Sequence, residues 1–324
     1  MNKLKKIGLT ALAGSLVATS VFAGEMAVTG SAAITFAGQD NTSSGNGFTM
    51  SDEIKFDGSG EMDNGWTVSV NMQLDNNAQD VAGNNMDNRS IKIDMGDAGT
   101  LKMVGHGGDS AMSAVDDVMP HADGNETWDT IAAAEGGATK LKSISGNSVN
   151  NMFSYTNSSM MDGLSVTATV SPSDGTNAST TNSYAVAYTG YDGLTVGYGI
   201  DENSEAGALQ TDMTTMYVKY VYGPVTVGYQ DSGEDSATAA DNDDFNAYGI
   251  SYAVNDSLTI SYNQSEYNDS GVATNDQENT AFAVSYTMGS MSFVGTMVSM
   301  DNVGGSTAAN DDVSGYEVGV TFAF

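Results

Sequence analysis

The sequence predicts an all-β protein, a closed antiparallel transmembrane β-barrel of about 16 strands. Three observations favour this class. Short segments in which apolar and polar residues alternate strictly recur along the chain. Short turns rich in Gly, Asn and Asp alternate with long polar connections. The chain ends in the alternating segment SGYEVGVTFAF (314–324), whose apolar residues need a surface to contact even at the last position.

The first residues carry a targeting signal. Residues 1–23 combine a start with three lysines, a short apolar stretch and small residues up to Ala23. This pattern is typical of a secretory signal peptide that is cleaved after Ala23. A membrane anchor is the alternative, but the apolar stretch is short and interrupted by Thr, Gly and Ser. We therefore expect residues 24–324 to be exported as one domain.

Charge and composition restrict the partners of the chain. The sequence has 41 Asp+Glu against 10 Lys+Arg, a formal net charge of −31. Nucleic acid is therefore excluded as a partner, because phosphate binding needs a basic surface. The chain has no Cys, which excludes disulfides and thiolate metal sites. No run of about 18 apolar residues follows the signal peptide, so we expect no membrane-spanning helix.

Seven hairpins can be placed in order along the exported chain. Each consists of two alternating segments around a short turn, the strongest being the Asp-Gly turn between Tyr188 and Leu194. The turns lie at 63–65, 96–99, 162–163, 192–193, 223–224, 255–256 and 289–290. With a first strand over 26–36 and a last over 316–324, the hairpins give the predicted strand number.

Long polar connections join these units. They are predicted at 38–53, 75–88, 106–147, 171–182, 201–213, 230–245, 263–279 and 299–314. In an up-and-down sheet, strict alternation of short and long connections places all the long ones at one end. The first and last strands can then pair and close the sheet, so the terminal strand is not an open edge.

The size of the barrel decides which face meets lipid. Sixteen strands enclose an interior too wide for side chains to fill, so the polar face must line water and the apolar face must contact lipid. Lys55, Lys92, Lys102 and Lys219 each lie between apolar neighbours, which places them on the water-filled side. A β-sandwich is the alternative, but it does not predict connections of alternating length.

Taken together, these features resemble the Gram-negative general diffusion porins, especially the alphaproteobacterial branch. The likeness rests on the signal peptide, the opening GEMAVTGSAAITFAG, the segments MMDGLSVTATV and YDGLTVGYG, and the terminal Phe324. The resemblance implies a 16-stranded homotrimeric barrel in the outer membrane that contacts lipid and passes small hydrophilic solutes and ions. It implies no cofactor and no enzymatic activity, and it implies that Phe324 is part of an assembly signal.

The resemblance also implies that the third long connection, 106–147, folds inward and narrows the pore. The expected acidic side of this constriction consists of Asp109, Asp116, Asp117, Asp123, Glu126, Asp129 and Glu135. The expected basic wall consists of Lys55, Lys92, Lys102 and Lys219. Because acids predominate in the long connections, we expect the channel to prefer cations.

Two other functions compete with this hypothesis. A soluble or surface-attached calcium-binding adhesive β-protein would use acidic clusters such as Asp241, Asp243 and Asp244, whose oxygens suit Ca²⁺ or Mg²⁺. A solvated acidic surface explains the same cluster without a metal. An outer-membrane enzyme would need a Ser/His pair on the outer wall, but both histidines, His106 and His121, lie in the third long connection.

Overall fold

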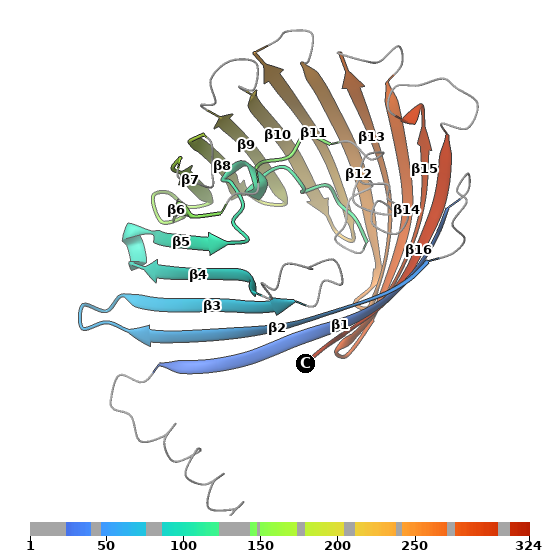
Figure 1. The fold of residues 1–324 in the computed structure, drawn as a ribbon. Coiled ribbons are helices and arrows are strands. Elements are labelled where there is room, and N and C mark those ends of the chain that lie inside the picture. The colour runs from blue at the N-terminus through green and yellow to red at the C-terminus, as the bar shows by residue number, and fades with distance from the viewer. Residues whose placement is uncertain are drawn as a thin grey trace, which may run out of the picture.

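The structure, a computed structural model, is a barrel that is closed by its first and last strands (Figure 1). It describes residues 24–39, 47–75, 86–122, 143–147, 150–173, 179–203, 211–237, 242–270, 276–303 and 312–324. The predicted signal peptide lies outside the described residues. Each strand pairs antiparallel with the next along the chain, and β16 pairs with β1. The predicted barrel of sixteen strands is therefore confirmed.

The elements have the following bounds. The strands are β1 Glu25–Gln39, β2 Gly47–Glu61, β3 Thr67–Asp75, β4 Met86–Asp94, β5 Thr100–His106, β6 Met152–Asn157, β7 Leu164–Ser171, β8 Thr181–Tyr191, β9 Leu194–Asn203, β10 Thr211–Tyr222, β11 Val225–Ser236, β12 Asp243–Asn255, β13 Leu258–Asp269, β14 Gln277–Met288, β15 Met291–Asp301 and β16 Val313–Ala323. Two short 3-10 helices are η1 Gly96–Ala98 and η2 Met112–Ala114. In the described part of the chain, no helix is long and apolar enough to cross a membrane.

Side chains alternate between an apolar outer face and a largely polar inner face. On β14, Phe282, Val284 and Tyr286 are exposed on the outside, whereas Asn279 and Ala281 are buried on the inside. The same alternation runs through β8, β10 and β12. A large apolar surface on the outside of a barrel needs an apolar surrounding, and the hydrocarbon of a membrane provides one.

The chain terminus closes the barrel. Phe324 and Gly30 exchange two backbone hydrogen bonds, each 2.9 Å long. From Ser31 opposite Ala323 to Gln39 opposite Gly315, β1 and β16 then run in register. The last strand therefore has a partner on both sides, β1 and β15, and presents no open edge.

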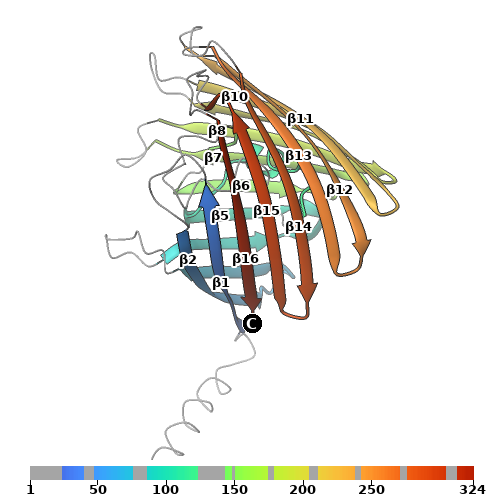
Figure 2. The same ribbon diagram turned by 90° about the vertical axis from the view of Figure 1, so that its right-hand side faces the viewer.

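The tight turns form one rim of the barrel, and β16 ends at the same rim (Figure 2). Neighbouring turns are linked by backbone hydrogen bonds: Thr189 donates to Gly163 and Val221 donates to Gly193, at 2.7 and 2.8 Å. Gly163 and Gly193 have φ angles of +76° and +73°, a conformation that glycine adopts at little cost. All seven turns lie where the sequence predicts them.

The predicted long connections are wider than the observed ones. The prediction at 230–245 overlaps strand at both ends, since β11 continues to Ser236 and β12 begins at Asp243. The prediction at 263–279 is wrong in the same way, because β13 continues to Asp269. Both faces of these strand ends carry polar residues. The apolar alternation that signals a strand is therefore lost there, although the hydrogen-bonded ladder continues.

The position of Phe324, where β1 and β16 close the barrel, predicts that this residue has a role in assembly. It lies over Gly30, where an added Cβ would come within 2.7 Å of the ring. Phe324→Ser removes this contact from the strand pair that closes the barrel, and should lower the yield of closed barrel severalfold. The measurement is the fraction of outer-membrane protein that shifts in electrophoretic mobility on heating.

Phe322→Ser is the matched control, because it removes an outward aromatic ring from the same strand and keeps the terminal Phe. Equal yields for the two variants would contradict a special role of Phe324. In channels that do assemble, we expect the conductance to be unchanged by either substitution.

Candidate functional site

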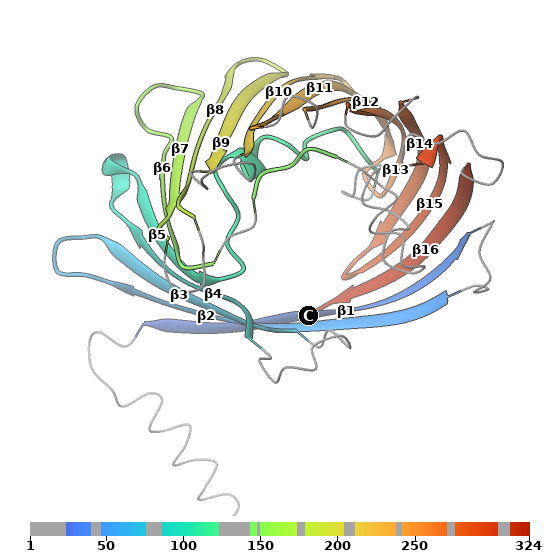
Figure 3. The same cartoon turned by 45° about the horizontal axis from the view of Figure 1, so that its top comes forward.

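The connection that leaves β5 runs along the inner wall of the barrel (Figure 3). We call residues 107–122 the inner segment. Its backbone is held by wall side chains from β7, β8 and β13. Ala111 N–H donates to Thr169 Oγ1 at 3.1 Å, Met112 N–H to Ser183 Oγ at 2.9 Å, and Ala122 N–H to Ser261 Oγ at 2.9 Å. These contacts fix the described start of the third long connection inside the lumen.

Glycines on the wall let the inner segment approach closely. An added Cβ at Gly199 would lie 2.7 Å from Val115 Cγ2, and one at Gly228 would lie 2.7 Å from Pro120 Cδ. Val115 is 2% exposed and Met112 is fully buried. A small apolar core thus forms between the segment and the wall. Sequence reasoning missed these glycines, although a glycine at an inward position of a strand is a signal of close backbone approach.

A short returning piece, 143–147, packs beside the inner segment. Ser110 N–H donates to the carbonyl of Asn147 at 3.0 Å, and Asn147 N–H donates to Asp201 Oδ2 at 2.8 Å. Gly146 N–H donates to Asp116 Oδ2 at 2.6 Å. The two pieces of the third long connection are therefore joined to each other and, through Asp201 on β9, to the wall.

Asp116 does not face the pore, contrary to the prediction from the sequence. Its side chain is 1% exposed, and its carboxylate accepts backbone N–H groups from Gly146 and Asp117. Burial, together with the neighbouring charge of Asp117, raises the pKa of Asp116 to about 7. Asp116 is thus an internal anchor, and it is partly protonated near neutral pH.

Two other predicted acids are exposed. Asp109 and Asp117 lie at the surface of the inner segment. Four predicted acids fall outside the described residues: Asp123, Glu126, Asp129 and Glu135.

The predicted lysines divide into two groups. Lys55, Lys92 and Lys102 line one polar recess of about 650 Å³ on the inner faces of β2, β4 and β5, which we call the lysine recess. Lys55 Nζ lies 3.0 Å from Glu53 Oε1. Lys219 lies elsewhere, on β10, where its Nζ donates to the carbonyl of Val118 at 3.4 Å and so supports the inner segment. All four lie on the water-filled side, as their positions in the sequence predict.

The acidic cluster on the connection before β12 gains no support as a metal site. Asp243 accepts a hydrogen bond from the Tyr267 hydroxyl, and Asp244 lies next to it on β12, while Asp241 is outside the described residues. Within the described ranges, no group of three His, Cys, Asp or Glu side chains could hold a metal ion. A divalent-cation site there stays a prediction.

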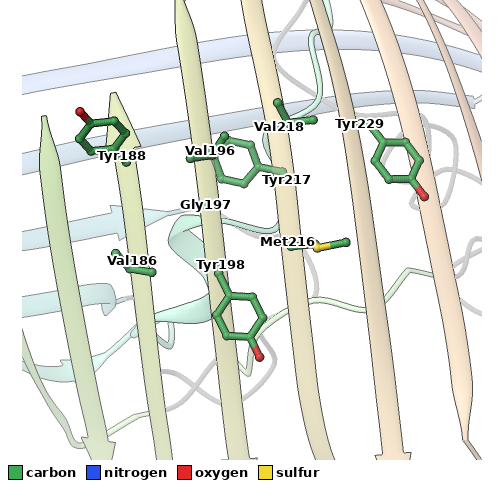
Figure 4. A pocket seen from close by; sticks show the side chains of 9 residues that line it. All are labelled: Val186, Tyr188, Val196, Gly197, Tyr198, Met216, Tyr217, Val218 and Tyr229. Atoms are coloured by element: carbon green, nitrogen blue, oxygen red, sulfur yellow. The ribbon is translucent and has the colours of Figure 1, made fainter. Parts of the chain in front are cut away.

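The outer face of the barrel carries apolar hollows. One of them has a volume of about 380 Å³ and lies over β8 to β11. Figure 4 shows the side chains that line it. Its side chains include Tyr188, Tyr198, Met216 and Tyr229. Such a surface suits lipid tails and aromatic contacts at the membrane interface.

These features define a transmembrane β-barrel with a water-filled lumen into which one connection folds. The chain belongs to the Gram-negative porin family, whose model matches residues 8–291. Family and fold together indicate the outer membrane as its location. No curated protein matches the chain.

Several solved structures share the fold. The anion-selective porin from Comamonas acidovorans is 15% identical, with 93% of this chain and 100% of that chain covered and a TM-score of 0.67. OmpF from Salmonella typhi, in complex with daunomycin, is 16% identical, with 93% and 98% covered and a TM-score of 0.66. A mutant of the Rh. blastica porin is 14% identical, with 93% and 100% covered and a TM-score of 0.63.

The burial of Asp116 predicts that the inner segment is held more tightly at low pH. The folded pKa lies above the ordinary value of 3.8. The packed state therefore binds the proton more strongly, and its stability falls as pH rises from about 4 to about 7. Hydrogen exchange of residues 110–122, corrected for intrinsic rates, should be slower at pH 5.5 than at pH 8.

Asp116→Asn should abolish this pH dependence, because its side chain does not titrate. Asp109→Asn is the control, since Asp109 is exposed and its replacement should leave the dependence intact. A pH dependence that persists in the Asp116→Asn protein would assign the effect to another group.

Proposed function

We propose that this outer-membrane porin is a passive, cation-preferring channel whose lumen is narrowed by the third long connection. The observation that carries the proposal is the inner segment, which is hydrogen-bonded to the inner faces of β7, β8 and β13. A segment held there occupies part of the cross-section that solutes must use. The size of a passing solute is then limited by the space left between this segment and the opposite wall.

The mechanism is diffusion through water without covalent change. Polar side chains, among them serine, asparagine and glutamine, line the open recess on the inner faces of β2 to β5. They replace part of the hydration of a polar solute, whereas an apolar solute finds no matching surface. We propose no cofactor and no enzymatic step for this passage.

The charge of the chain supports cation preference. The sequence carries 41 Asp+Glu against 10 Lys+Arg, and Asp109 and Asp117 are exposed on the inner segment. Excess fixed negative charge raises the local concentration of cations at a narrow opening. The Comamonas acidovorans porin, which has a similar fold, is described as anion-selective. The distribution of charge, rather than the fold, must therefore decide whether such a channel prefers anions or cations.

We also propose that the barrel assembles as a homotrimer. A solved structure of OmpT from Vibrio cholerae, which shares the fold at 13% identity and a TM-score of 0.65, is described as a trimer form. The alternative, a soluble or surface-attached calcium-binding adhesive protein, gains no support. Such a protein would not need the apolar outer belt that this barrel carries.

Deleting residues 112–122 should enlarge the pore. The deletion removes the packed part of the inner segment and leaves the pairing of β5 with β6 in place. Single-channel conductance in planar bilayers and the size limit for sugars in liposome swelling should both rise. Conductance equal to that of the full chain would contradict the proposal that the inner segment narrows the pore.

The cation preference should weaken as salt rises. At about 0.1 M salt the Debye length is roughly 10 Å, and at about 1 M it is roughly 3 Å. The reversal potential under a KCl gradient, measured with a chelator to remove divalent ions, should indicate cation preference at low salt and little preference at high salt. Anion preference at low salt would mean that the lysine recess controls the narrow part.

A further inference from the structure

Two residues of opposite charge lie close to each other on the outer face of the barrel, Asp52 on β2 and Arg89 on β4. Asp52 alternates in step with Met50 and Ile54, which are exposed on the outside. Arg89 lies two positions before Ile91, which is also exposed there. Both charged side chains are exposed. Because every second side chain of a strand lies on the same face, both point out of the barrel towards the membrane.

Asp52 is enclosed by apolar residues along its own strand. Phe48 and Met50 lie between Asp52 and the start of β2, and each is 60% exposed on the outside. Ile54 lies on the other side of Asp52. An aspartate side chain is short, so it cannot extend past two apolar residues to reach water as lysine and arginine do. A charge in such a place needs a partner of opposite sign.

Arg89 is the single arginine in the sequence. The four lysines that the structure describes face the lumen, so Arg89 is the one described basic residue on the outer face. Gly105 makes room for its side chain, since an added Cβ there would lie 3.0 Å from Arg89 Nε. Arg89 lines a hollow of about 510 Å³ together with outward apolar residues, among them Val70, Met72, Ile91 and Phe153. Such a hollow fits an apolar surface that carries a carboxylate.

Asp52 and Arg89 cannot pair within one chain. The register partner of Arg89 is Met72, and Met72 pairs with Phe56 on β2. Asp52 lies four residues further along β2 than Phe56. Two strand spacings and four residues along a strand place the two Cα atoms roughly 16 Å apart, beyond the joint reach of the side chains. In the part of the chain that the structure describes, neither residue takes part in an ion pair.

We propose that Asp52 of one copy of the chain pairs with Arg89 of a neighbouring copy, and that this ion pair joins the outer faces of two barrels. A second copy fits because the same surface supplies both charges. A contact between two different patches of identical chains repeats around a closed ring. The proposal rests on the proposed function, which takes the barrel to be a homotrimer, and it names the charges that hold the copies together.

A lipid with an anionic headgroup is the other candidate partner of Arg89. It could lay its acyl chain in the apolar hollow and its headgroup on the guanidinium. It would leave Asp52 unpaired among apolar residues, whereas a second copy satisfies both charges. The observations therefore favour a second copy.

Charge reversal in the full-length chain tests the pair. Asp52→Lys and Arg89→Glu each place two like charges at the contact. The fraction of oligomer in mild detergent, measured by size-exclusion chromatography with light scattering, should fall severalfold in either variant. Asp52→Lys/Arg89→Glu restores opposite charges and should recover the wild-type fraction. Glu266→Lys is the matched control, because it reverses an outward charge on β13 and should leave the fraction unchanged.

Cross-linking of cysteines gives a second measurement, made in the outer membrane. The chain has no Cys, so Asp52→Cys/Arg89→Cys introduces its only two thiols. Within one copy these positions are too far apart for a disulfide, which needs Cα atoms within about 7 Å. A short bifunctional thiol reagent should join neighbouring copies of the double variant into dimers and trimers. Either single cysteine variant should give no such product.

A double cysteine variant that folds and conducts, yet gives no cross-linked product, would overturn the proposal. An oligomer that is not recovered by the double charge reversal would do the same. Loss of the oligomer in Arg89→Glu but not in Asp52→Lys would also overturn it, and would indicate a lipid headgroup as the partner of Arg89.

The proposed function is tested separately. The size of the wild-type oligomer reports on the homotrimer, whichever face joins the copies. Conductance and cation preference in KCl report on the channel, because each barrel closes on itself and encloses its own lumen.

Discussion

The backbone of a chain that crosses hydrocarbon must satisfy its hydrogen bonds within the protein, since lipid tails offer no partners. In this barrel the requirement is met strand by strand and completed between β1 and β16. The last residue takes part, because Phe324 and Gly30 bond to each other through both backbone groups. The rest of the structure depends on this closed ladder of hydrogen bonds: the outward apolar residues, the inward polar residues and the rim of linked turns.

Closure with sixteen strands creates the space that the inner segment then occupies. The wall is adapted to the segment in two chemically different ways. Wall hydroxyls from Thr169 and Ser183 receive its backbone N–H groups, and Gly199 leaves room for Val115. Lys55, Lys92 and Lys102 lie on another part of the wall, formed by β2, β4 and β5. One part of the wall therefore holds the inner segment, and another part carries three lysines.

Local patterns in the sequence were sufficient to predict the strands, the turns and the inward face of the lysines. An Asp-Gly or Asn-Gly pair between alternating segments specifies a hairpin through short-range geometry alone. The burial of Asp116 was not predictable in this way, because it depends on Gly146, which lies thirty positions further along the chain. The ends of the long connections were misplaced, because strand continues at Asp231 and Ser232 without an apolar partner face.

The pairing of β1 with β16 also has a consequence for the order of events in assembly. The two strands that close the barrel are made first and last, so most of the chain separates them when they meet. Contacts between such distant positions must overcome a large loss of chain entropy before they contribute any stability, which makes folding slow. Until Phe324 has been synthesised and delivered, every intermediate keeps two unpaired strand edges. A nascent chain of this kind depends on the cell to keep those edges from pairing with another molecule.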